Sequence, residues 1–466
     1  MFMRATIEKL PKAKWTRQHA AHLLKRASFS GSSVEINECF HLGLEASVKL
    51  ILAGRQPGAV SSPSRKRIDP QFLAEIPQLP NQKHVSDDGM KTAYQKHQQK
   101  LFTLQMQWLQ RMLDSGGPLE KIVLFWHGML TSSYTKVNSA GFIVRQNQLF
   151  RECAFGDYRA LVKRVLLDPA MVVYLDIDKN KRTKPNENFA RELLEMFTLG
   201  EGNYQSALIK KIAREIVGLR LKRRKDKLPY ETLDLKGMEA NSGFSDQERR
   251  LSRLIDSVFD LPVCGELLVR RLWKFYVSED QVDEDRVKFL AYELRKSGWK
   301  ISVVLEQIFL SEAFFDTSVI GQQIKSPVQY LLQAHKEVGA VTIDPQAALY
   351  TMQKLGQSLF NPPNVSGWSA GMTWINGTTL SARYELSKIM VRVMGRQSNP
   401  ASKAFYELMK KNRDQGLLIM LDHFIATSLP AVKSELFVAM AKRVKSEEHV
   451  EIFILYLMCM PEYQMC

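Results

Sequence analysis

Apolar and polar positions recur at helical spacing from the start of the chain, and residues 16–53 fit two helices. The polar stretch Ser30-Gly31-Ser32 separates the two runs. Thr16 precedes the first run and Ser32 or Ser33 the second, and such side chains accept hydrogen bonds from the free amides of a first helical turn. The pattern therefore predicts two capped helices.

The same periodicity continues through most of the remaining sequence. From Thr92 to Leu113, Leu and Met recur among Gln and Lys as in a long amphipathic helix. Residues 119–129 form an apolar helical run, and Pro118 suits the first turn of that helix. Residues 230–235 alternate as a strand does. We therefore expect an all-α protein, a large multi-helix bundle in two lobes, with at most a short β-hairpin near residues 220–240.

Chain length supports two lobes, because 466 residues exceed what one hydrophobic core usually serves. Prolines without periodicity mark a linker, and a dense run of basic residues marks a boundary between the lobes. The expected division is 1–53 for the N-terminal helical part of the first lobe, 54–93 for a loop or linker, 94–219 for the central helical lobe with most of the polar motifs, 220–245 for a basic loop or hairpin, and 246–466 for the C-terminal helical lobe.

Composition places the chain among folded globular proteins, with 45% hydrophobic and 24% charged residues. A formal net charge of +16 favours acidic partners, so a polyanion or nucleic acid could bind, above all through the run from Lys222 to Lys227. The alternative is a modest excess of charge without a specific partner, and no nucleic-acid motif occurs.

The cysteines and the N-terminal residues indicate in which cellular compartment the protein is expected. Five widely spaced cysteines match no zinc spacing and are expected to be reduced thiols: Cys39, Cys153, Cys264, Cys459 and Cys466. The first residues lack the basic and apolar regions of a signal peptide, and no apolar stretch has membrane-helix length. These features predict a cytoplasmic protein without a transmembrane segment.

The most polar helix motif runs from Lys184 to Gly200. Asn186 is a natural N-cap, and a helix N-terminus rich in amides attracts anions. Glu187, Arg191 and Glu195 lie at i, i+4 and i+8, as in a self-stabilising exposed helix. Asn188 and Glu192 form a second row, at the same spacing. The motif is either a ligand site or a stable surface helix.

Two further motifs hold polar groups on otherwise apolar helices. His127 lies in Phe125-Trp126-His127-Gly128 and is either a general acid or base, or a core residue. Thr131 at i+4 excludes a zinc pair within that helix. In Arg145-Gln146-Asn147-Gln148 at least one amide must turn inward, either to a ligand or to another helix.

Two loops complete the candidates. Asp176 and Asp178 are possible ligands of a divalent metal, but the spacing lacks the pattern of a calcium loop, so a solvated acidic turn is favoured. We expect no metal site, and no cofactor motif occurs. Trp368, in a loop rich in Pro, Gly and Asn, could stack on a sugar or base, as could Trp374, or either could anchor the loop.

The order of these motifs resembles that of a bacterial family called domain of unknown function 1800. The stretches that carry the resemblance are residues 22–31, 42–46, 125–128, 145–148, 168–200, 267–277, 325–327 and 355–368. The resemblance implies a helical fold and the candidate residues above, but no reaction. It also implies export in many relatives, against a cytoplasmic location, and a possible partner from the sulfatase-like family called domain of unknown function 1501. At Val217-Gly218-Leu219 the chain departs from the family pattern.

Three functions follow as hypotheses. The first is a hydrolase or transferase for a polar or anionic substrate, whose pocket gathers the candidate residues. Glu187 or Glu192 would be acid or base, His127 a proton shuttle, and Arg145 or Arg191 an anion clamp. Gln146, Asn147, Asn186, Asn188 and Trp368 would bind substrate. The second is a non-catalytic helical scaffold for an acidic or protein partner, and the third is nucleic-acid binding.

Overall fold

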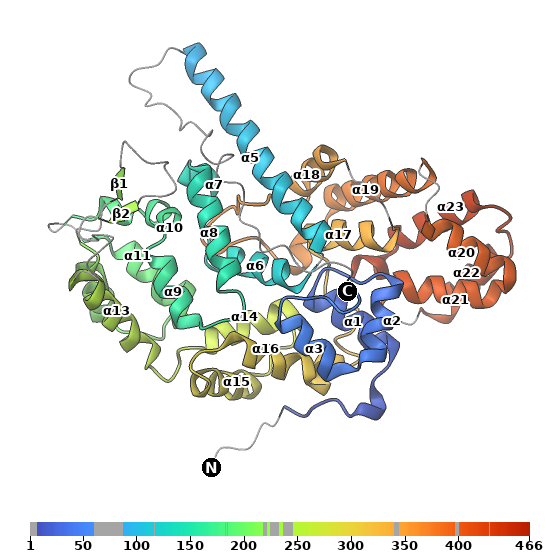
Figure 1. Ribbon diagram of the computed structural model, residues 1–466, viewed down its shortest axis with the longest axis horizontal. Coiled ribbons are helices and arrows are strands. Elements are labelled where there is room, and N and C mark those ends of the chain that lie inside the picture. The colour runs from blue at the N-terminus through green and yellow to red at the C-terminus, as the bar shows by residue number, and fades with distance from the viewer. Residues whose placement is uncertain are drawn as a thin grey trace.

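Helices make up nearly all of the regular structure, as the sequence pattern predicts (Figure 1). The computed structural model describes residues 7–59, 87–115, 117–181, 183, 185–217, 221–223, 233–235, 246–339, 344–396, 400–427 and 429–466. In this part of the chain no helix is long and apolar enough to cross a membrane.

The N-terminal segment forms three helices where the pattern predicts two. Both expected caps are confirmed: Thr16 accepts from the backbone N of His19, and Ser32 forms a capping box with Glu35. The second predicted helix is broken at Gly43, whose φ of 84° suits glycine far better than other residues. The segment contains η1 (Lys12–Lys14), α1 (Arg17–Ala27), α2 (Ser33–Leu42) and α3 (Leu44–Leu52).

The central segment begins with the expected long helix, α5, which projects from the body in Figure 1. The predicted position of Pro118 in a first helical turn is confirmed in α6. The elements are α5 (Asp87–Ser115), α6 (Pro118–Met129), α7 (Tyr134–Val137), α8 (Ala140–Glu152), α9 (Tyr158–Leu166), α10 (Pro169–Tyr174), η3 (Ile177–Lys179), α11 (Glu187–Glu192), η4 (Leu193–Thr198) and α12 (Ser206–Glu215).

The polar motif helix changes geometry halfway along. It starts as α11 and continues as the π-helix η4, in which the hydroxyl of Thr198 donates to the carbonyl of Leu193 at 2.7 Å. Phe189, Leu193 and Phe197 form an apolar stripe along this segment and are buried. The stripe therefore packs into the core although the helix widens.

The expected hairpin region contains two antiparallel strands, β1 (Leu221–Arg223) and β2 (Leu233–Leu235), with Lys222 opposite Asp234. The rest of the basic run, residues 224–227, and residues 60–86 of the expected linker lie outside the described residues.

The C-terminal half is again helical. Its last helices gather at one end of the molecule in Figure 1, away from β1 and β2. The elements are α13 (Asp246–Phe259), α14 (Glu266–Tyr276), α15 (Glu284–Lys296), α16 (Ile301–Leu310), η5 (Glu312–Phe315), α17 (Pro327–Glu337), α18 (Pro345–Lys354), η6 (Gly371–Trp374), α19 (Gly377–Arg396), α20 (Pro400–Lys411), α21 (Arg413–Phe424), α22 (Ala431–Ala441), α23 (Glu447–Cys459) and η7 (Pro461–Gln464).

Buried apolar side chains form one contiguous cluster that runs from Ala20 to Tyr463. The apolar helix α6 packs against α3, α5 and α8, while α17 packs against α18 and α19. Segments from both ends of the chain and from its middle therefore meet at the centre of the molecule. The division into two lobes stays a prediction.

Candidate functional site

Asn186 caps α11, as the sequence predicts. Its Oδ1 accepts from the backbone N of Asn188 at 3.0 Å, and its Nδ2 donates to the carbonyls of Leu175 at 3.0 Å and Asp176 at 3.2 Å. The backbone N of Asn186 donates to Asn180 Oδ1 at 2.8 Å. The amide thus fastens the helix start to the preceding loop. Asn188, the next predicted ligand group, is exposed.

The charged residues of α11 lie at or near the surface. Arg191 Nη2 is 3.6 Å from Glu187 Oε2 in a solvent-exposed ion pair, which contributes little to stability. Glu195, the third member of the expected ladder, accepts from the hydroxyl of Tyr204. Burial, with the charge of Glu195, raises the pKa of Glu192.

Gln146 is buried and links α8 to neighbouring segments. Its Oε1 accepts from the hydroxyl of Ser132, and its Nε2 donates to Asp168 Oδ1 at 3.2 Å. Burial raises the pKa of Asp168 to about 7, although the charge of Arg145 opposes the rise. Arg145 itself is exposed. Gln146 therefore completes a buried hydrogen-bond chain.

Asn147 belongs to a second buried network. Its Oδ1 accepts from Arg151 Nη2 at 2.9 Å. Arg151 forms a bidentate pair with Glu120, with both N–O distances at 2.8 Å. Trp108 Nε1 donates to the same carboxylate at 2.9 Å. The network ties α5, α6 and α8 together, and such a buried pair is costly to break from one side.

His127 is enclosed by aromatic rings. Its ring centroid lies 5.5 Å from Trp108, 6.0 Å from Phe150, 5.7 Å from Phe360 and 5.5 Å from Trp368. The side chain is fully buried, and neither ring nitrogen has a hydrogen-bond partner within the described structure. Burial lowers the pKa of His127 to about 3. The imidazole is therefore neutral at ordinary pH and separated from solvent.

Asp176 is engaged by two lysines at the surface. Its carboxylate lies 3.2 Å from Lys136 Nζ and 2.5 Å from Lys179 Nζ. The side chain of Asp178 lies outside the described part of the structure. Among the described residues, no group of three or more His, Cys, Asp or Glu side chains is arranged to hold a metal ion.

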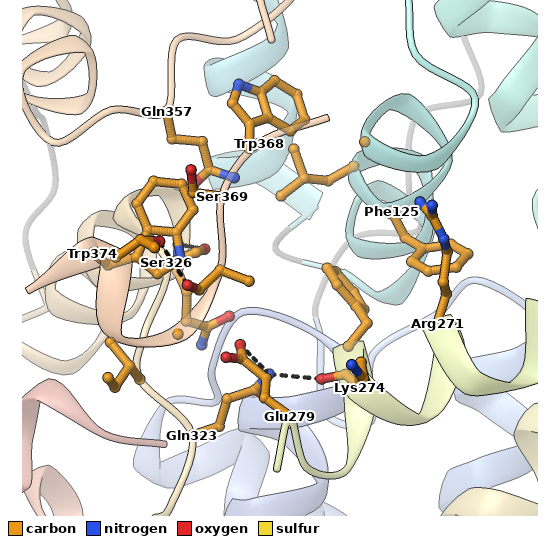
Figure 2. Close-up of a pocket in the computed structure, with 18 of the residues that line it drawn as sticks. Phe125, Arg271, Lys274, Glu279, Gln323, Ser326, Gln357, Trp368, Ser369 and Trp374 are labelled. Carbon is orange, nitrogen blue, oxygen red and sulfur yellow. Dashed lines mark hydrogen bonds between the residues drawn. The ribbon is translucent and has the colours of Figure 1, made fainter. Parts of the chain in front are cut away.

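A cavity of about 640 Å³ opens beside these networks. Figure 2 shows Trp368 and Trp374 on the side of the cavity away from Arg271, and Phe125 beside Arg271. Its walls come from α6, from α14 and the turn after it, from the start of α17, and from the loop that ends in η6. Of the residues predicted to form a site, Trp368 lines this cavity.

Two tryptophans from the loop before and within η6 form one wall (Figure 2). Trp368 Nε1 donates to the carbonyl of Ser358 at 3.2 Å, which fixes the indole plane. Gly367, with φ 87°, lies so close to Gly128 that an added Cβ would be 2.1 Å from that residue's carbonyl oxygen. The loop is therefore seated directly on the C-terminal turn of α6, and Trp374 is held almost fully buried beside it.

The charged side of the cavity comes from α14 and the following turn. Arg271 and Lys274 line it, and neither side chain forms a hydrogen bond or ion pair with another described residue. Burial lowers the pKa of Arg271. Glu279 accepts from Gln323 Nε2 at 3.1 Å (Figure 2). A Cβ on Gly371 would lie 2.2 Å from the Glu279 carboxylate, so this glycine leaves room for it.

The floor contains two buried cations. Arg26 donates to the carbonyls of Phe275 at 3.3 Å and Tyr276 at 2.9 Å, and so caps the C-terminus of α14. Lys121 Nζ donates to Gln329 Oε1 at 2.5 Å and lies 5.0 Å from the ring of Phe29. Burial lowers the pKa of Lys121 to about 7.

The arrangement offers flat aromatic surfaces, unpaired cations and two carboxylates, Glu279 and Asp280, around a solvent-reachable space. Such a set can stack a ring, bind an anion and exchange a proton. Arg271, Lys274 and Glu279 were not selected from the sequence. Arg271 and Lys274 lie within the motif Leu267–Val277. The basic residues of that motif follow no regular pattern, and this was the sequence feature that could have identified them.

Comparisons with known proteins give a family and nothing more specific. A family model described as protein of unknown function (DUF1800) matches residues 22–465. No curated protein and no solved structure matches the chain.

Proposed function

Because the chain belongs to the DUF1800 family, whose function is unknown, we propose from its own geometry that it binds a small anionic molecule with a sugar-like or aromatic ring. The ligand occupies the cavity between Trp368 and Arg271. The ligand is of the polar or anionic kind expected from the sequence. Its site is at the centre of the molecule and not at the start of α11, where the sequence placed it.

The unpaired guanidinium of Arg271 carries the proposal. Arg271 is partly buried, and no acceptor or carboxylate engages it among the described residues. A partly desolvated charge without a partner is unfavourable, and a planar guanidinium suits the two oxygens of a carboxylate, phosphate or sulfate. Lys274, one helical turn further along α14, adds a second unpaired cation to the same wall.

The tryptophan wall supports a ring-bearing ligand. An indole face offers a large apolar surface to the C–H face of a sugar or to an aromatic ring. Trp368 and Trp374 lie on the side away from Arg271 in Figure 2. A ligand with a ring at one end and an anionic group at the other can therefore contact both walls.

Glu279 makes hydrolysis or group transfer the favoured activity. It is a carboxylate on the cavity wall, oriented by Gln323, and can serve as general acid or base. His127 lies behind Trp368 with its ring nitrogens enclosed, so Glu279 takes the proton-transfer role in this proposal.

The scaffold hypothesis has support at other residues. Hydrogen bonds within the chain engage the side-chain amides of Gln146, Asn147 and Asn186. They stabilise the helices around the cavity, and this role is compatible with a ligand site beside them. A sulfatase-like partner remains a prediction from the family resemblance.

Binding can be tested by thermal unfolding with sugar phosphates, sugar acids and sulfated sugars, each compared with its neutral parent sugar. An anionic ligand at one hundred times its Kd should add about 2.7 kcal/mol to the free energy of unfolding. Arg271→Met should abolish this gain, because the methionine keeps the apolar stem and loses the charge. Glu279→Gln should retain binding and lose turnover of any compound that the wild type converts.

Lys288→Met is the matched control, since Lys288 is an exposed cation on α15 that does not line the cavity. It should bind like the wild type. Equal stabilisation by charged and neutral sugars, or full binding by Arg271→Met, would refute the proposal.

A further inference from the structure

Cys466 lies on the floor of the cavity, with only 3% of its surface exposed. Its backbone N donates to the carbonyl of Gln323 at 2.8 Å, and the adjacent Met465 pairs with Ile324 as an isolated β-bridge. These contacts fix the residue against the segment before α17. The sulfur atom therefore has a defined place beside the cavity.

Cations from two other helices converge on this sulfur. Arg26 Nη1, from α1, donates to Cys466 Sγ at 3.4 Å. The guanidinium cannot easily turn away, since its remaining N–H groups hold the end of α14. Lys121, from α6, lines the same cavity and acts on the thiol electrostatically. The thiol therefore lies beside the guanidinium of Arg26 and near a lysine whose pKa is about 7.

A third cation, Lys325, supplies an independent sign that an anion belongs here. Its side chain is 1% exposed, and its Nζ has no hydrogen-bond acceptor among the described residues. The ammonium lies 3.5 Å from the ring centroid of Tyr463, and its charge acts on Cys466. Burial lowers the pKa of Lys325 to about 7, so its charged form is held at neutral and lower pH, where a nearby anion stabilises it.

The buried carboxylate of this region is already engaged. Glu337, whose charge acts on Lys325, lies 3.5 Å from Lys25 Nζ. It also accepts from Gln333 Nε2 at 2.7 Å and from the Tyr463 hydroxyl at 2.9 Å. Glu337 is therefore occupied by these partners, and the guanidinium of Arg26, which donates to Cys466 Sγ, is left to stabilise a thiolate.

One more cation borders the cluster from α19. Arg383 is 1% exposed and donates from Nη2 to the carbonyl of Lys325 at 2.6 Å and from Nη1 to Gln464 Oε1 at 3.2 Å. Its charge also interacts with Cys466. Every helix that contributes a charged group to this sulfur, α1, α6 and α19, contributes a cation.

We propose that Cys466 is a nucleophilic thiolate on the cavity floor, and a site of covalent modification by small anionic electrophiles that enter the cavity. The sulfur attacks an electrophilic carbon, an S–C bond forms, and the leaving group departs with the electron pair of the broken bond. The thiolate has no proton to release in this step. The surrounding cations favour electrophiles that carry a negative charge.

The other cysteines provide internal comparisons. Burial raises the pKa of Cys39 and Cys459 to about 11 and that of Cys264 to about 12. Burial would also raise the pKa of Cys466, but the charges of Arg26, Lys121 and Lys325 outweigh it and hold that pKa below its ordinary value. Cys459 is exposed, so access alone favours it over Cys466. A faster reaction at Cys466 would therefore report thiolate character.

The test is alkylation of the folded chain with iodoacetate and, separately, with neutral iodoacetamide between pH 5.5 and 9. Mass spectrometry gives the rate at each cysteine. At pH 7, Cys466 should react at least about tenfold faster than Cys459, since one pKa unit changes the thiolate fraction about tenfold. The ratio of the iodoacetate rate to the iodoacetamide rate should be higher at Cys466.

Two variants distinguish local charge from accessibility. Lys325→Met should slow alkylation of Cys466 by about threefold at pH 6, where this lysine, whose pKa burial lowers to about 7, carries its charge, and should leave the rate at pH 9 nearly unchanged, because the lysine is then neutral in the wild type. Lys388→Met removes a charge beside Cys459 and should not alter Cys466. If Lys325→Met does not fold, the wild-type pH profile and reagent ratio still decide.

The proposal is overturned if Cys466 in the folded wild type is unreactive or reacts only above about pH 9. It is also overturned if the ratio of the iodoacetate rate to the iodoacetamide rate is no higher at Cys466 than at Cys459. The measurement uses no bound ligand. Its outcome is therefore independent of whether Arg271 and Trp368 bind the anion proposed above.

Discussion

Asp168 offers the sharpest test of the buried networks, through replacement by asparagine. Its carboxylate is 3% exposed at the N-cap of α10, where Oδ1 accepts from the backbone N of Ala170 at 3.0 Å and from Gln146 Nε2 at 3.2 Å. Burial raises its pKa from 3.8 to about 7. The folded protein therefore binds this proton more tightly than the unfolded chain does.

The pKa difference determines the size and sign of the effect. A carboxyl group whose pKa is raised on folding lowers stability as pH increases from its unfolded pKa towards its folded pKa. The interval between 3.8 and about 7 corresponds to about 4 kcal/mol at 1.36 kcal/mol per pKa unit. The full cost of the buried charge is present above about pH 7, and it disappears below about pH 4.

Asp168→Asn keeps an oxygen that can accept from Ala170 and cannot ionise. At pH 8 the variant should be more stable than the wild type by up to about 4 kcal/mol. At pH 4.5 the two should differ by no more than about 1 kcal/mol, since an amide has one acceptor oxygen in place of two. Urea unfolding at pH 4.5, 6 and 8 measures the difference.

Two comparisons isolate the Asp168 carboxylate. His127, whose pKa is lowered by burial, makes stability fall as pH decreases below about 6.5, but it does so in both proteins and cancels. Asp157 caps α9 by accepting from the backbone N of Ala160 at 3.1 Å and is partly exposed, so Asp157→Asn is the matched control for an aspartate N-cap that is not buried. A stability difference for Asp168→Asn that stays constant from pH 4.5 to 8 would refute the reasoning.

Three further substitutions test single features by urea unfolding at pH 7. His127→Phe should raise the free energy of unfolding by about 1 to 3 kcal/mol, since it removes two buried nitrogens without partners; a loss would contradict this. Arg151→Met should cost about 3 to 5 kcal/mol by stranding the Glu120 carboxylate, and adding Glu120→Gln should recover part of that loss. Asn186→Ala should cost about 1 to 2 kcal/mol through the lost N-cap, whereas Glu187→Ala should cost no more than about 0.5 kcal/mol, so equal effects would argue against the cap.

The helices were largely predictable because their signals are local. Apolar spacing, the caps at Thr16 and Ser32 and the proline at Pro118 act within a few residues, and the structure has all of them. One error came from geometry that spacing does not encode: Gly43, with its positive φ, divides one expected helix.

The cavity was not predictable because its residues come from distant segments. Arg26 caps the C-terminus of α14 although it lies 250 residues earlier in the sequence than the carbonyl it contacts at Tyr276. Trp368 lies opposite Arg271 only once the helices have packed. Trp368 could be selected because a tryptophan in a loop rich in glycine and proline is unusual by itself. A single arginine on an amphipathic helix, or a glutamate in the turn after it, carries no such local signal.

A polar residue in an apolar setting either binds a ligand or links parts of the fold. Whether its hydrogen-bonding groups are engaged within the chain distinguishes the two roles. Asn186 engages both N–H groups and its oxygen within the chain, so its polarity is explained without a ligand. Gln146 likewise donates and accepts inside the core. Arg271 and Lys274 line a cavity, and their side chains form no hydrogen bond or ion pair with another described residue. An unsatisfied cation is costly to keep beside a cavity, whereas a satisfied amide is not, so the search for a ligand belongs at α14 and not at the start of α11.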